Sequence, residues 1–108
     1  MVGIDLVEHK DFIDKDDRFI RYVLSSLEYE YYLSVSNDKR RLEYLASRFA
    51  CKEAIIKCFG KKISFSKISI LNKKNGAPYV LIDNVEQKLQ ISLSHTDSYS
   101  VAICINLP

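Results

Sequence analysis

Residues 48–60 read RFACKEAIIKCFG, and this stretch decides the fold. It continues a helical pattern that begins earlier in the chain. The apolar residues of that pattern recur at intervals of three, four and seven, so they share one helix face: Leu42, Leu45, Phe49 and Ile56. Glu53 falls at the edge of this apolar stripe, where a charged side chain is unusual in a helix that packs on a core.

The ends of this helix are marked by capping residues. Asn37 or Asp38 can cap its N-terminus, and Gly60 suits its C-terminal cap after Phe59. The sequence therefore predicts one long helix over about residues 38–59.

The residues before this helix predict a strand and shorter helices. MVGIDLV at the start reads as a short buried strand that ends near Asp5. The next segment mixes helical apolar spacing with dense charge, and we expect its helix to be interrupted near Asp14 to Asp17. A further helix begins at SSLEYEYYL, where Ser25 and Glu28 are spaced as a capping box.

After Gly60 the period of the apolar residues changes from that of a helix to that of strands. Asn75-Gly76 lies between two apolar runs and predicts a hairpin. LQISLS and YSVAICI predict two more strands joined by HTDS. The expected fold is a single α+β domain over residues 1–108, with an N-terminal strand and helices followed by a mostly antiparallel β meander.

Composition excludes several classes of protein. The chain has 108 residues, 47% of them hydrophobic, which suits one domain with a modest core. Sixteen basic and 14 acidic residues give a net charge of +2, too balanced to indicate a nucleic-acid binder. No apolar run approaches the roughly 20 residues of a membrane span, so we expect a soluble cytoplasmic protein. The cysteines form no CxxC pair and are interpreted as packing residues: Cys51, Cys58 and Cys104.

Four residues are candidates for chemistry, and each also has an ordinary structural interpretation. Asp5 could cap a turn. Glu53 and Lys57 have the favoured order of a surface pair four residues apart, worth only about 0.3 to 0.5 kcal/mol. His95 could be a turn residue between the last two strands.

Taken together, four stretches resemble the holo-acyl-carrier-protein synthases, the small bacterial 4′-phosphopantetheinyl transferases. These stretches are GIDLVE (3–8), RFACKEAIIK (48–57), NGAPY (75–79) and SLSHT (92–96), and they occur in the order of the family's motifs. RFACKEAIIK beside SLSHT is the specific part of the resemblance, whereas GIDLVE alone is weak.

The resemblance implies a homotrimeric enzyme with the 4′-phosphopantetheinyl transferase fold and active sites between subunits. Such an enzyme moves 4′-phosphopantetheine from coenzyme A to a serine of apo-acyl-carrier protein, releases adenosine 3′,5′-bisphosphate, and supports fatty acid biosynthesis. Mg²⁺ is the implied cofactor, and no nucleic acid or membrane partner is expected. A hard cation held by one or two carboxylates and by substrate phosphates would explain the position of Glu53.

The resemblance also implies roles for individual residues. Asp5 and Glu53 match the carboxylates that hold the metal, and Lys57 matches the lysine near the transferred phosphate. The general base is left open between Glu53 and a metal-bound water. The remaining matches bind coenzyme A: Arg40 and Arg48 through its phosphates from a neighbouring subunit, Gly76 and Pro78 beside the nucleotide, and His95 with Thr96.

Two segments depart from the family's pattern. The loop after Gly60 continues as KKIS where the family has a longer glycine-rich stretch. The first helical segment, which in the family is basic and grips the acidic carrier protein, contains Asp11 where an arginine is expected, and three further aspartates follow. We therefore expect Arg18 and Arg21, on the less acidic side, to carry the docking of the carrier protein.

Two other functions fit the residues less well. A non-catalytic relative that only binds carrier protein or coenzyme A would not need Asp5, Glu53, Lys57 and His95 together. An RNA-binding α+β module would use the basic clusters, but no aromatic RNA-binding motif accompanies them. Those clusters are Lys39-Arg40-Arg41, Lys61-Lys62 and Lys73-Lys74.

Overall fold

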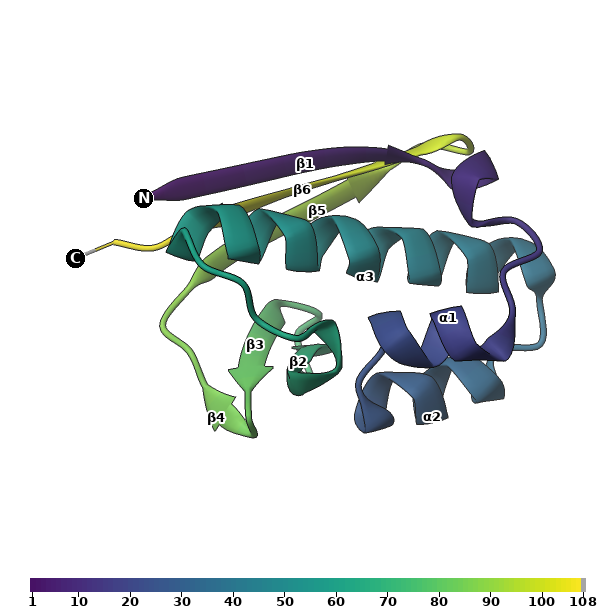
Figure 1. The fold of residues 1–108 in the computed structure, drawn as a ribbon, viewed down its shortest axis with the longest axis horizontal. Helices are drawn as coiled ribbons and strands as arrows, with labels where there is room; N and C mark the ends of the chain where they lie inside the picture. Colours follow the sequence, from purple (N-terminus) through teal and green to yellow (C-terminus); the bar gives the residue numbers. More distant parts are fainter. Residues whose placement is uncertain (108) are drawn as a thin grey trace.

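The computed structural model describes residues 1–107, and it confirms an α+β chain built around one long helix (Figure 1). Its elements are, in order, β1 (Val2–Glu8), the 3-10 turn η1 (His9–Phe12), α1 (Asp17–Val23), α2 (Ser26–Ser34), α3 (Asp38–Phe59), η2 (Phe65–Lys67), β2 (Ile68–Asn72), β3 (Pro78–Ile82), β4 (Val85–Glu86), β5 (Gln90–His95) and β6 (Tyr99–Ile105). No helix among residues 1–107 is long and apolar enough to cross a membrane.

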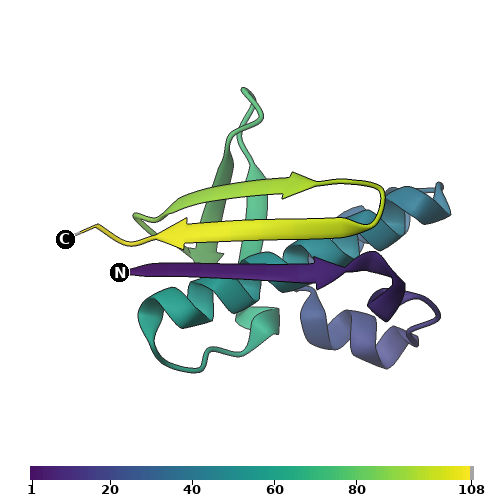
Figure 2. The ribbon, with the colours of Figure 1, turned by 90° about the horizontal axis from the view of Figure 1, so that it is seen from above.

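The strands form two antiparallel three-stranded sheets, in the orders β1-β6-β5 and β2-β3-β4. The first sheet covers α3 along its length, and α1, α2 and the second sheet lie on the other side of the helix (Figure 1). Seen from above, the β2–β3 hairpin extends beyond the β5 edge of the first sheet (Figure 2).

Two sequence expectations need correction. The first strand does not end near Asp5 but continues to Glu8, because β6 pairs with it over its whole length, with Asp5 opposite Ala102. The strands after Gly60 do not form one meander. The β5–β6 hairpin leaves β4 and joins β1, since pairing with the N-terminal strand lets β6 pack on α3.

The long helix is buried on two faces. The predicted stripe around Leu45 and Phe49 packs in a cluster with α1 and η2, as the spacing indicated. A second, mostly small-residue face packs in a cluster with residues of both sheets: Ala50, Cys51, Ala54, Ile55 and Cys58. Small side chains there let the strands approach the helix, and burial raises the pKa of the Cys51 thiol to about 12. The interpretation of the cysteines as packing residues is confirmed, since all three are free and buried.

The predicted caps are present. The Asn37 side chain accepts a hydrogen bond from the Arg40 amide at the start of α3, and Gly60 ends the helix with a φ of 71°, in the left-handed region that glycine tolerates. Ser25 and Glu28 form the complete capping box of α2. The break near Asp14 to Asp17 is also confirmed, because η1 ends at Phe12 and α1 begins at Asp17.

Close contact between β1 and α3 depends on Gly3. A Cβ atom added there would lie 1.9 Å from the Ala54 carbonyl oxygen and 2.8 Å from the Cys58 amide nitrogen, so no other residue fits without moving the strand. Asp5, two residues later, therefore faces the long helix directly.

Candidate active site

The first group of predicted residues lies where the β1 edge meets α3. Asp5 faces the helix and is only 17% exposed, and its carboxylate lies 3.1 Å from the Lys57 ammonium. Lys57 also donates a hydrogen bond of 3.0 Å to the Ile4 carbonyl. Glu53 is one helical turn before Lys57 and partly buried. The surface pair expected from Glu53–Lys57 spacing is replaced by an ion pair between helix and strand.

The donor set of this edge suits a hard divalent cation. β1 and α3 run in opposite directions (Figure 1), and Gly3 lies against Ala54 and Cys58. Two residues along a strand span about 6.6 Å, close to the rise of one helical turn, so Asp5 is level with the turn that carries Glu53. No group of three metal-binding side chains occurs within residues 1–107. Two carboxylates completed by substrate phosphates are the usual arrangement for Mg²⁺, so the residues fit the expected metal.

The second group of predicted residues lines a hollow of about 880 Å³ on the β5 side of α3. Arg40, Arg48 and His95 all contribute to its wall, as do Asn72 and Tyr79 of the second sheet. Gly76 lies in the β2–β3 turn and Pro78 begins β3, next to Tyr79. Thr96 follows His95 in the β5–β6 turn, where its hydroxyl accepts hydrogen bonds from the Ser98 and Tyr99 amides.

Arg48 is held in place by several groups although it lines the hollow. Its guanidinium donates to the Ile70 carbonyl at 3.1 Å and lies 4.4 Å from the centre of the Tyr44 ring. Its Nε is buried without a hydrogen-bond partner, 3.9 Å from the carboxylate of Glu28. A cation fixed in this way loses little conformational freedom when it binds an anion.

Sequence patterns did not indicate the aromatic residues in the hollow. Tyr31 and Tyr44 line it, with ring centres 4.9 Å apart, and Tyr79 faces it from β3. Burial raises the pKa of Tyr44 to about 12, so its phenol stays protonated at neutral pH. Flat rings beside two arginines suit a ligand that combines phosphates with a planar base.

The two groups of residues do not share one hollow within this chain. Asp5, Glu53 and Lys57 are absent from the lining of the hollow that holds Arg40 and His95. Their strands, β1 and β5, are opposite edges of the first sheet. The chain therefore carries two separate parts of the predicted site.

The predicted docking residues lie on α1. Arg21 forms an ion pair of 2.7 Å with Asp17, and its guanidinium lies 4.4 Å from the centre of the Tyr29 ring. Hydrogen bonds from Tyr29 and Arg21 lower the pKa of Asp17. Arg18 lies on the same short helix. Its neighbour Phe19 lines a second hollow of about 460 Å³, together with Phe12 and Phe49 among others.

A family model described as "4′-phosphopantetheinyl transferase superfamily" matches residues 1–104. The chain belongs to this superfamily. Among transferases of this family, the holo-[acyl-carrier-protein] synthase of Anoxybacillus flavithermus is 36% identical, over 94% of this chain and 89% of the relative. That of Enterococcus faecalis is 38% identical, over 94% of this chain and 91% of the relative.

Solved structures of the transferase family share the fold. A holo-(acyl-carrier-protein) synthase from Bacillus anthracis, crystallised in complex with CoA (3′,5′-ADP), aligns with a TM-score of 0.84 and 28% identity, over 95% of this chain and 91% of that one. The family resemblance, the α+β class and the assignment to an enzyme family are thereby confirmed.

Proposed function

We propose that this protein transfers 4′-phosphopantetheine from coenzyme A to a serine of apo-acyl-carrier protein, giving holo-acyl-carrier protein and adenosine 3′,5′-bisphosphate. The observation that carries the proposal is that the same chain has an Asp5–Lys57 ion pair at the β1 edge and a separate hollow lined by arginines and tyrosines. The relative from Bacillus anthracis was crystallised with CoA (3′,5′-ADP), which supports the choice of donor. The cell's cytoplasm and fatty acid biosynthesis are the proposed setting.

The residues of the hollow would bind the nucleotide end of coenzyme A. Arg40 and Arg48 would pair with its phosphates, because guanidinium groups match phosphate oxygens in charge and geometry. Tyr79 and the turn around Gly76 would flank the nucleotide. His95 and Thr96 would bound the same ligand from the β5–β6 turn.

The residues of the β1 edge would act on the transferred phosphate. Asp5 and Glu53 would hold Mg²⁺, which when bound supplies positive charge against the pyrophosphate and its leaving group. Lys57, poised beside Asp5, would stabilise charge on the phosphate or protonate the leaving oxygen. Glu53 or a metal-bound water would accept the proton of the attacking serine, and positioning supplies most of the rate in such transfers.

A homotrimer would bring the two parts of the site together. The outer face of the first sheet is apolar, and Val2, Ile4 and Leu6 are each more than half exposed there. The outward residues of β6 continue this face next to β1: Val101, Ile103 and Ile105. An exposed apolar face of this kind favours an interface, and a ring of copies would place the β1 edge of one protomer near the β5 side of the next.

The acidic carrier protein would dock against α1. Arg18 and Arg21 supply positive charge there, and the hollow between α1 and the β1 edge adds a wall of aromatic side chains. That hollow includes Leu6 and Phe49, so it adjoins the strand and the helix that carry Asp5 and Glu53. A carrier serine placed there would lie close to the transferred phosphate.

Mass spectrometry tests the proposal. Apo-carrier protein incubated with the enzyme, coenzyme A and Mg²⁺ should gain the mass of one phosphopantetheine group, and the gain should disappear when the target serine is changed to alanine. Tight binding of either substrate without any mass gain would instead identify a non-catalytic relative.

A further inference from the structure

A buried chain of hydrogen bonds links the floor of the arginine-lined hollow to a histidine. Ser47 of α3 lines the hollow and is nine-tenths buried. Its Oγ lies 2.9 Å from the Oγ of Ser100, which is itself 2.7 Å from Nε2 of His9. The other ring nitrogen of His9, Nδ1, lies 3.1 Å from the carbonyl oxygen of Asp97.

The directions of these bonds follow from the fixed acceptor at one end. A carbonyl oxygen only accepts, so Nδ1 of His9 carries a proton, and in the tautomer with that single proton Nε2 accepts. Ser100 therefore donates to His9, which uses its only proton. The Ser100 oxygen is then left to accept the proton of Ser47.

We propose that Ser47 contacts coenzyme A as a hydrogen-bond acceptor, and that His9 is a positioning residue that sets this polarity through Ser100. Because the Ser47 proton points inward to Ser100, the Ser47 oxygen, in the wall of the hollow, can only accept a hydrogen bond from a ligand there. The Ser47 oxygen can therefore bind an N–H or O–H group of the ligand but not a phosphate oxygen. The inference rests on the proposed function, since it requires coenzyme A in this hollow.

His9 also ties the turn that carries His95 to the body of the protein. Its amide donates to the Ser98 carbonyl at 2.8 Å, and its ring donates to the neighbouring Asp97 carbonyl. Lys39 of α3 holds the Asp97 carboxylate at 2.8 Å from outside. The hydroxyl chain and the turn are therefore fixed by the same histidine.

Coenzyme A binding by calorimetry tests the contact, with Ser66→Ala, an exposed serine of η2, as the matched control. Ser47→Ala should weaken binding about fivefold, as expected for one neutral hydrogen bond, and Ser66→Ala should not. Repeating the titrations with adenosine 3′,5′-bisphosphate shows which part of coenzyme A donates the hydrogen bond to Ser47. If Ser47→Ala loses as much affinity for this nucleotide as for coenzyme A, the donor belongs to the nucleotide. If Ser47→Ala loses no affinity for it, the donor belongs to the pantetheine arm. Wild-type affinity for coenzyme A in Ser47→Ala overturns the proposal.

A double-mutant cycle tests the role of His9. In His9→Leu, Ser100 can donate to Ser47, whose proton then turns toward the hollow, so binding should weaken about as much as in Ser47→Ala. The double variant His9→Leu/Ser47→Ala should lose little more than either single variant. If His9 had only a structural role, the losses of binding free energy in the two single variants would add in the double variant. Additive losses would therefore contradict the proposed action of His9 through Ser100. Ser100→Ala, which leaves the turn intact, should repeat the His9→Leu result if that variant unfolds.

The outcomes separate this inference from the proposed function. A wild-type protein that fails to bind coenzyme A overturns both. A wild-type protein that binds and transfers, with Ser47 and His9 variants that bind equally well, overturns only the inference. Steady-state rates add a further check, because the KM for coenzyme A should rise in these variants while kcat stays near its wild-type value.

Discussion

At the scale of single residues, the partner of Lys57 determines how the β1 edge is interpreted. A lysine four residues after a glutamate would ordinarily pair with it on the helix surface. Here Lys57 instead reaches Asp5 on β1, which leaves Glu53 without its expected partner. The sequence identified all three residues through their resemblance to a family motif, but spacing alone pointed to the wrong pair, because the contact joins residues 52 positions apart.

The carboxylates should be essential for transfer and dispensable for folding. Asp5→Ala and Glu53→Gln should each lower the transfer rate by at least about a hundredfold, because losing preorganised charge stabilisation commonly costs that much. Single-turnover assays in Mg²⁺ measure the rates, and circular dichroism checks the fold. Glu30→Gln, an exposed carboxylate on α2, serves as the control and should keep full activity. A near-normal rate in either test variant means that the metal assignment is wrong.

At the scale of elements, a buried ion pair joins α2, α3 and the second sheet. Lys52 is fully buried, and its ammonium donates to Glu28 at 2.5 Å and to the carbonyls of Val23 and Phe65. Glu28 also accepts the Ile70 amide at 2.8 Å. The sequence predicted Glu28 as part of a capping box, which is a local pattern. It gave no sign of Lys52 as the partner, because helical periodicity does not report contacts between separate elements.

Breaking this pair from one side should destabilise the protein strongly. Lys52→Met leaves the buried Glu28 carboxylate without its closest cation, with only the Arg48 guanidinium remaining at 3.9 Å, so the free energy of unfolding should fall by about 3 kcal/mol. Adding Glu28→Gln removes the stranded charge and keeps an acceptor for the Ile70 amide, so part of the loss should be recovered. Urea unfolding measures both variants.

An exposed pair provides the control for that experiment. Lys39→Met breaks the ion pair with Asp97 at the surface and should cost less than about 1 kcal/mol. Equal losses for Lys52→Met and Lys39→Met would contradict the importance assigned to the buried pair.

The short helix α1 should govern affinity for the carrier protein. Changing Arg18 and Arg21 together to Glu should raise the KM for carrier protein severalfold and leave the KM for coenzyme A nearly unchanged, because complementary charge acts mainly on association. The salt dependence of the reaction should flatten. Arg21 also pairs with Asp17, so thermal unfolding must confirm that α1 survives.

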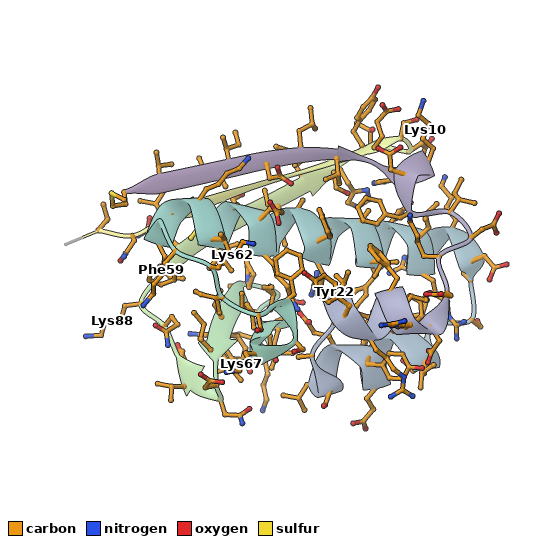
Figure 3. All side chains as sticks on the ribbon, in the orientation of Figure 1. Lys10, Tyr22, Phe59, Lys62, Lys67 and Lys88 are labelled. Carbon is orange, nitrogen blue, oxygen red and sulfur yellow. The ribbon has the colours of Figure 1, made fainter. Side chains whose placement is uncertain are left out.

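Lys88 provides a matched charge reversal, because it lies at the other end of the molecule from Lys10 and η1 (Figure 3). Lys88→Glu changes the net charge in the same direction, by half as much as the double α1 variant, and should leave both KM values near wild type. If the double α1 variant also keeps its KM for carrier protein, docking occurs on another surface.

At the scale of the whole molecule, local patterns and long-range pairing differ in how far the sequence reveals them. The long helix, its caps and the Asn75-Gly76 hairpin were predictable, because each is encoded within a few neighbouring residues. The pairing of β6 with β1 was not, since it joins the two ends of the chain. That pairing creates the apolar outer face and places the two parts of the site at opposite edges of one sheet.

The central claim is that a neighbouring copy completes each active site, and subunit mixing tests it most directly. Asp5→Ala and His95→Ala, each nearly inactive alone, should regain activity when unfolded and refolded together. In a mixed ring, the interface that joins the intact Asp5 of one protomer to the intact His95 of the next carries neither lesion. Random mixing into trimers leaves about a quarter of the sites intact, so about a quarter of wild-type activity should return. No recovery, with mixed trimers demonstrated by native mass spectrometry, would contradict the claim and place both residues in a site within one subunit.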